Sequence, residues 1–206
     1  MWRRRYARSV LFWWLLLGLG LGSIVVPLIV GICLADEFHA RVRLHFACSA
    51  SAIWTSILDV ERHPLSGIQC RGVTQLPSEV GAVCWAEDLG RAQLSVSSEV
   101  VDPEARVVLH ASVSGLPMLT RWEAELLDLG PEGCELFLSN RTIVRSGSWR
   151  SPLVRLVMAC SGGARKVLLE YAWELAQARG VSVVPLDPSA PRILKPRGVG
   201  SRARAQ

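Results

Sequence analysis

The stretch from Ser151 to Arg179, SPLVRLVMACSGGARKVLLEYAWELAQAR, decides the fold. Its apolar side chains recur every three or four residues, the spacing of one helix face. They stand at Leu153, Val157, Ala164, Leu168, Tyr171 and Leu175. Gly180 suits the end of such a helix, because glycine adopts the left-handed conformation that often closes one. The spacing therefore predicts one long helix whose apolar face must be buried against another element.

The residues before this helix form short runs of alternating apolar and polar side chains, separated by turn residues. Phe38–Cys48 is expected to be the first strand. A short helix is expected over Ala52–Leu58, and His63-Pro64 ends it. Six more strands are predicted, at Ile68–Leu76, Val83–Leu89, Gln93–Val101, Arg106–Val113, Thr120–Leu129 and Cys134–Arg145.

Strands at this spacing favour an antiparallel meander with one apolar face. That face must be covered, and the final helix is the large apolar element left to cover it. The sequence thus predicts an α+β, helix-grip architecture, in which a curved antiparallel sheet wraps around a long C-terminal helix.

This order of elements resembles the START-like superfamily, of the polyketide cyclase/dehydrase (SRPBCC) type. The resemblance covers roughly Arg41 to Ala178, within a domain predicted at residues 38–179. The first strand runs into ACSASAIWTSILD, where Trp54 and Asp59 fill characteristic places. Residues 120–126 and the turn at 133–136 resemble the family's penultimate hairpin. The stretch HPLSG at residues 63–67 keeps the family's proline and lacks its tryptophan.

The resemblance implies a cavity between the sheet and the final helix that holds lipids, sterols, polyketides or other apolar ligands. A binding protein for a hydrophobic small molecule or lipid is therefore the leading hypothesis. Two alternatives stay open, a cyclase- or dehydrase-like enzyme and an interaction module with a filled core, because a fold does not determine a function.

The ligand-binding residues expected from these faces are Trp85, Glu87, Leu109, Trp122, Leu138, Asn140, Gly162, Gly163 and His63. The glycine pair either leaves room for a ligand or marks close packing or a kink. Glu87 shares the face of Trp85, so its carboxylate either enters the cavity, where burial would raise its pKa, or sits at a strand end in water. His63 is expected at the cavity mouth and His110 in solvent. No nucleophile motif occurs, so no catalytic residue is predicted.

No charged residue occurs between Ser9 and Ala35, a run longer than the ~20 residues that cross a bilayer. This run predicts a transmembrane helix over residues 9–35; a cleaved signal peptide is the alternative. Four arginines precede the run and two acidic residues follow it. A basic cytoplasmic segment at residues 1–8 and an extracytoplasmic domain are therefore expected. Gly18 and Gly22 form a GxxxG motif that would allow helix-mediated self-association.

Residues 180–206 are rich in proline and basic side chains and are expected to form a flexible tail. The net charge of +5 comes from the two ends of the chain, and the stretch between them is mildly acidic. Nucleic acid is therefore not an expected partner, because a nucleic-acid-binding domain carries its positive charge on the fold. The expected partners are the membrane and an apolar ligand.

The six cysteines form no CxxC pair and no histidine cluster accompanies them, so neither a metal site nor a cofactor is predicted. Cys70 and Cys84 flank a turn near Pro77. They either pair as a disulfide in an oxidising compartment or remain free thiols.

Overall fold

The structure, a computed structural model, describes residues 20–23, 25–77 and 82–186. Within that part of the chain, no helix has the length and apolar composition to span a bilayer. Residues 20–23 and 25–33 are helical. Leu34 and Ala35 are described but are not helical, so the helix ends before the expected residue 35. Residues 9–19 and 24 of the expected span lie outside the described residues, as do the basic segment 1–8 and the GxxxG position Gly18.

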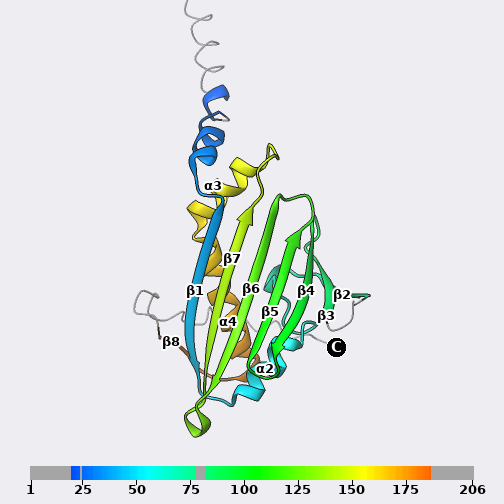
Figure 1. The fold of residues 1–206 in the computed structure, drawn as a ribbon, viewed down its shortest axis with the longest axis vertical. Helices are drawn as coiled ribbons and strands as arrows, with labels where there is room; N and C mark the ends of the chain where they lie inside the picture. The colour runs from blue at the N-terminus through cyan, green and yellow to red at the C-terminus, as the bar shows by residue number, and fades with distance from the viewer. Residues whose placement is uncertain (1–19, 24, 78–81, 187–206) are drawn as a thin grey trace, which may run out of the picture.

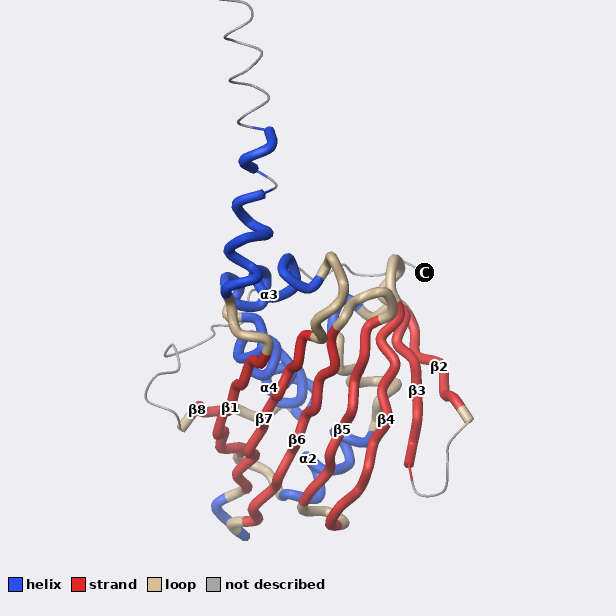
Figure 2. The backbone as a smooth tube through the Cα atoms, turned by 45° about the horizontal axis from the view of Figure 1, so that its top comes forward, coloured by secondary structure: helices blue, strands red, loops and turns tan. Residues whose placement is uncertain are grey.

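One antiparallel sheet with helices on one side forms the domain (Figures 1 and 2). The helices are α2 (Ala50–Leu58), α3 (Ser151–Ser161) and α4 (Gly163–Arg179), with short 3-10 turns η1 (Gly67–Gln69) and η2 (Gly130–Glu132). The strands are β1 (Glu37–Phe46), β2 (Gly72–Leu76), β3 (Ala82–Asp88), β4 (Gln93–Asp102), β5 (Arg106–Val113), β6 (Met118–Asp128), β7 (Cys134–Val144) and β8 (Val183–Pro185). The spatial order is β2-β3-β4-β5-β6-β7-β1-β8. This arrangement confirms the predicted α+β helix-grip architecture.

The pairing register gives the sheet an inner face that the helices cover. Leu109 lies opposite Trp122, which lies opposite Asn140, and Asn140 lies opposite Ala40. These alternate positions are shielded from solvent because side chains two residues apart share one face of a strand. The core joins this face to α2 and α4, and its fully buried members include Phe46, Ile53, Trp85, Leu136, Leu168 and Leu175. Each such side chain stabilises the fold by about 1.5–3 kcal/mol.

The single helix expected over residues 151–179 is wrong, because the chain breaks it at Gly162. Gly162 adopts φ +59°, the left-handed region, so it ends α3 and begins α4. Residues with a Cβ pay roughly 1–2 kcal/mol for that conformation. The helix that the sheet grips is α4 alone, which packs on β1 and β7 through Leu168, Ala172 and Leu175.

The expected tail begins later than residue 180. Val183 and Val184 pair with Phe46 and His45 on the free edge of β1, so β8 extends the sheet. Branched side chains such as valine favour strands, which suits them to this edge. Residues 187–206 lie outside the described part of the chain.

The β2–β3 hairpin does not bring Cys70 and Cys84 opposite each other. Cys84 lies opposite Leu76, whereas Cys70 precedes β2 and its thiol donates to the carbonyl of Gly72 at 3.3 Å. Both are free thiols in the structure.

Candidate ligand-binding site

Most of the predicted ligand-binding residues share the inner face of the sheet. They are Trp85, Glu87, Leu109, Trp122, Leu138 and Asn140, all of them buried. The alternation of side chains along the strands therefore brought these positions to one surface, as the sequence predicted. Whether they contact a ligand remains a prediction.

Glu87 is fully buried, so the alternative that it sits in water at a strand end is wrong. Its Oε1 accepts hydrogen bonds from the Leu65 N–H at 2.8 Å and the Trp85 indole N–H at 2.9 Å. Its Oε2 accepts from the Ser66 N–H at 2.8 Å and also from the Ser66 hydroxyl. Both oxygens act as acceptors, the role of an ionised carboxylate. Glu87 thus anchors the loop after α2 to the sheet.

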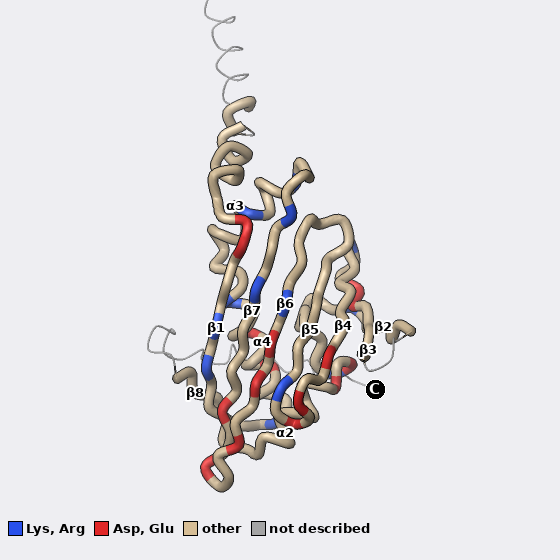
Figure 3. The backbone as a smooth tube through the Cα atoms, viewed as in Figure 1, with Lys and Arg blue, Asp and Glu red and all other residues tan. Residues whose placement is uncertain are grey.

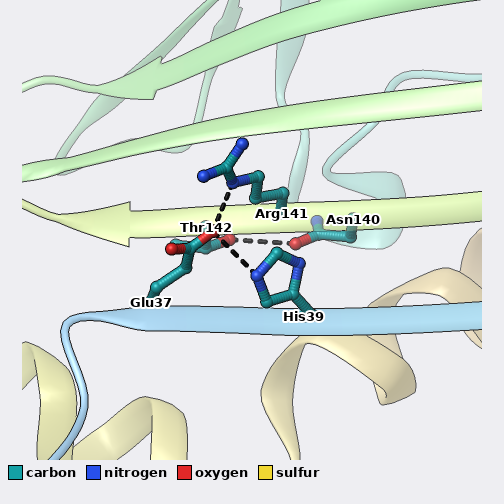
Figure 4. Close-up of polar contacts among 5 residues, drawn as sticks. All are labelled: Glu37, His39, Asn140, Arg141 and Thr142. Atoms are coloured by element: carbon teal, nitrogen blue, oxygen red, sulfur yellow. Dashed lines mark hydrogen bonds and ion pairs between the residues drawn. The ribbon is translucent and has the colours of Figure 1, made fainter.

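Three aromatic or amide side chains meet beside α4. The rings of Trp122 and Tyr171 contact edge to face, with centroids 5.8 Å apart and planes at 80°. Asn140 lies opposite Trp122 on the neighbouring strand. Its side-chain oxygen accepts a hydrogen bond from the Thr142 hydroxyl at 2.9 Å (Figure 4). That hydroxyl also lies 3.1 Å from the Thr120 hydroxyl.

The polar tips of these three residues lack protein partners. No described residue hydrogen-bonds to the indole N–H of Trp122, the amide NH2 of Asn140 or the hydroxyl of Tyr171. All three residues are buried, yet none of the tips is fully enclosed. Each tip is therefore accessible to a water-sized molecule, although neither of the two hollows described below is lined by these residues. We call Trp122, Asn140 and Tyr171 the inner polar group.

Tyr171 contributes to this group as a neutral phenol. Burial raises its pKa, and the negative charges of Glu87 and Glu174 raise it further. Deprotonation is thus disfavoured at neutral pH, and the hydroxyl is available to donate a hydrogen bond.

His63 lines an open hollow of about 530 Å³ between the loop after α2 and the last turns of α4. Its lining is Glu61, Arg62, His63, Pro64, Gly67, Glu174, Gln177 and Ala178. Partial burial lowers the pKa of His63, and the nearby arginines Arg179 and Arg62 act in the same direction against the opposing charge of Asp59. A neutral imidazole on a mostly polar rim fits a hydrogen-bonding role there.

A second hollow, of about 490 Å³, lies on the outer face of the sheet and was not predicted. Its lining is Arg41, Val42, Arg43, Glu123, Glu125, Phe137, Leu138, Ser139 and Leu186. The guanidinium of Arg43 lies 5.0 Å above the Phe137 ring and pairs with Glu135. Charged residues recur along these strands (Figure 3). Outward charges are ordinary on a solvated sheet face, so no signal in the sequence singled this place out.

Gly162 and Gly163 do not line the inner face beside the predicted residues. Gly162 is exposed, and a Cβ there would meet no atom within 4 Å. A Cβ at Gly163 would meet the Ser161 hydroxyl and the Met158 sulfur, which belong to α3 rather than to the sheet. Of the two interpretations of this pair, the structure shows the kink.

No family model and no curated protein matches this sequence. Among solved structures, the Zhui aromatase/cyclase from a Streptomyces species is similar, with a TM-score of 0.52 at 15% identity over 69% of this chain and 94% of that chain. The di-domain ARO/CYC StfQ from the steffimycin biosynthetic pathway gives a TM-score of 0.50 at 10% identity, over 71% of this chain and 52% of that chain. A START superfamily protein from Mycobacterium smegmatis gives 0.48 at 14% identity, over 70% and 97%.

At such low identities, structural likeness bears on the fold and not on the activity. The first two likenesses agree with the helix-grip architecture described above. The domain has a helix-grip fold.

Proposed function

We propose that this chain is a membrane-anchored binding protein for a hydrophobic small molecule or lipid, held between the sheet and α4. The observation that supports the proposal is the inner polar group, whose polar tips lack protein partners among the described residues on a largely apolar face. Ligand sites commonly combine apolar walls with a few polar groups that fix the orientation of the ligand.

The energetics favour a ligand over a permanently filled core. A buried donor without a partner costs about 1–3 kcal/mol. The tips of Trp122 and Asn140 are not fully enclosed, so water is able to meet them, whereas a core filled by side chains alone would leave them unsatisfied. A bound molecule with an acceptor oxygen removes the cost, so the preferred ligand is apolar and carries a carbonyl, hydroxyl or ester oxygen.

The same residues give less support to a cyclase- or dehydrase-like enzyme. Both carboxylate oxygens of Glu87 already accept hydrogen bonds, so a substrate proton would have to displace those donors. Tyr171 stays neutral because its pKa is raised. A general base must lie within hydrogen-bond distance of the proton that it accepts and have a suitable pKa. Both oxygens of Glu87 are already occupied and Tyr171 stays protonated, so neither residue suits this role.

Anchoring is supported by the uncharged run from Ser9 to Ala35. Its described helical part exposes apolar side chains, at Leu21, Val25, Val26, Ile29, Val30 and Ile32. An exposed apolar helix continuous with an uncharged segment is typical of an element surrounded by lipid.

The test is native mass spectrometry of the full chain in lipid nanodiscs, followed by solvent extraction and identification of the extract. We expect a bound apolar molecule, with Asn140→Leu weakening its retention at least fivefold because the amide donors are lost. Ser139→Ala is the matched control, since this neighbour faces the outer hollow. An empty chain that also binds no lipid offered to it would refute the proposal, and loss in the Ser139 variant instead would move the site to the outer face.

A further inference from the structure

The N-terminal helix is packed against the domain and does not simply lead into it. A Cβ at Gly31 would overlap the carbonyl group of Pro152 in the first turn of α3, so the two backbones touch. Glycine permits this close approach because it has no side chain. Figures 1 and 2 show the helix and α3 together at one end of the domain. Residues 25–33 and α3 therefore form one structural unit.

This end of the domain exposes large apolar side chains. In α3, Ser151 is the buried residue, whereas Val157 is 63% exposed and Leu153 and Leu156 are half-buried on the same side. The Trp149 side chain, just before α3, is 72% exposed. A contiguous apolar surface of this kind marks a site of interaction with protein or membrane. We call Trp149, Leu153, Leu156 and Val157 the α3 face.

Arginines accompany the α3 face without carboxylate partners. Arg150 donates to the Gly115 carbonyl at 2.8 Å, and its guanidinium lies 5.4 Å above the Trp149 ring. Arg155 donates to the Ser146 hydroxyl at 3.0 Å. Within the described chain, neither these two nor Arg145 forms an ion pair with a carboxylate.

Several arginines elsewhere in the domain do have carboxylate partners. On the outer face, Arg43, Arg106 and Arg141 each pair with a glutamate. Glu37, which lies at the same end as α3, is shared by Arg141 and His39 (Figure 4). Acidic residues also gather at the opposite end, around the β6–β7 turn with Asp128 and Glu132 (Figure 3). Arginines without carboxylate partners thus lie beside the N-terminal helix, although Asp36 and Glu37 are at the same end.

We infer that the α3 face lies on the surface of the anionic phospholipid bilayer that holds the N-terminal span; this rests on the anchoring in the proposed function. Tryptophan favours the headgroup region of a membrane. A helix with an apolar side and basic neighbours lies in the interface with its apolar side among the acyl chains. Arg145, Arg150 and Arg155 meet lipid phosphates, for which guanidinium groups are well suited. The close contact between Gly31 and Pro152 keeps α3 next to the N-terminal helix and thus near the bilayer surface.

The experiment is hydrogen–deuterium exchange of the full chain in nanodiscs of phosphatidylcholine, with and without phosphatidylglycerol. We expect the amides of residues 149–161 to exchange more slowly when the anionic lipid is present. Peptides from the β6–β7 turn serve as the internal control and should not change. Each arginine near an anionic surface contributes about 1 kcal/mol, or about fivefold. Replacing Arg145, Arg150 and Arg155 by glutamate should therefore lower the equilibrium constant for docking by at least about a hundredfold.

Two further variants distinguish a loss of docking from a loss of the fold. Val157→Ser alters a side chain that is already exposed and should reduce the protection while leaving the fold intact. Arg41→Glu removes a charge from the outer hollow and should leave the protection unchanged. Equal exchange in both lipids, or protection that survives the arginine replacements, overturns the docking.

Alkaline extraction of vesicles separates this inference from the proposed function. If the chain stays with the vesicles while α3 exchanges freely, docking is wrong and anchoring stands. If the chain is washed off, the anchoring is wrong and the docking that depends on it is overturned as well.

Discussion

Replacing Glu87 is the most direct test of the fold around the candidate site. Glu87→Ala leaves the Leu65 N–H and the Trp85 indole N–H without partners, and both hydrogen bonds are buried. At about 1–3 kcal/mol for each unsatisfied donor, the loss is about 2–6 kcal/mol. The Ser66 groups add less, because their bonds are only partly buried and water is able to replace them. We therefore expect the free energy of unfolding to fall by about 4 kcal/mol.

Glu87→Gln should cost less, about 1–2 kcal/mol. The amide oxygen still accepts the Leu65 and Trp85 donors, while the amide NH2 faces the Ser66 N–H and only the Ser66 hydroxyl is able to turn and accept from it. Glu125→Ala is the matched control. It removes an exposed glutamate from the outer face and should change stability by no more than about 0.5 kcal/mol.

The assay is urea unfolding of the full chain in mild detergent, followed by tryptophan fluorescence, to which the buried Trp85 contributes. Thermal unfolding offers a second measure, with about 2–4 °C expected per kcal/mol for a domain of this size. A Glu87→Ala variant within about 1 kcal/mol of the parent would refute the view that Glu87 anchors the loop. The same conclusion would follow if the alanine and glutamine variants were equally unstable.

Three other outcomes are expected. Gly162→Ala should lower the free energy of unfolding by about 1 kcal/mol in the same assay, because alanine is strained at φ +59°. Gly72→Ala is the control and should not lower it, because Gly72 is exposed in a strand and has no positive φ. Burial raises the pKa of the Cys134 thiol to about 12, so this thiol should resist alkylation at pH 8 until the chain unfolds. The exposed Cys160 should be alkylated under the same conditions, and mass spectrometry identifies the modified residue. Tyr171→Phe should leave the melting temperature nearly unchanged, since the hydroxyl has no described protein partner, but should weaken binding of the co-purified ligand.

The strands were predictable because their signal is local. Apolar and polar residues alternate along β5 and β7, and the observed bounds of these strands lie within one residue of those expected. The break at Gly162 was not predictable in the same way, since glycine inside an apolar helical pattern permits a left-handed residue without requiring one. The short strand β8 depends on a free edge of β1 formed by residues far away in the sequence. Proline and basic residues around it suggested a tail instead.

The residues of the candidate site were predictable from the sequence, but the hydrogen bonds that they form were not. Alternation placed Trp85 and Glu87 on one inward face, which the structure confirms. Two of the donors to Glu87 are backbone amides more than twenty residues earlier, and a backbone N–H has no sequence signal of its own. A buried carboxylate does require donors. That requirement predicts donors near a buried Glu87, but it does not indicate that they belong to the loop at residues 64–66.

The inner face is closed tightly at one end and loosely at the other. The loop after α2 is fixed by the donors that converge on Glu87, and α4 is fixed by Leu168 and Leu175. In α3, by contrast, Ser151 is the buried residue, and Gly162 separates α3 from α4. Segments with few buried contacts open at a smaller cost in free energy than the core does. We therefore expect the end near α3 to open more readily than the end closed by Glu87, and in the proposed arrangement this end faces the bilayer. If the proposed function holds, a hydrophobic ligand that exchanges there would pass from lipid to protein without crossing water, which is the costly part of its route.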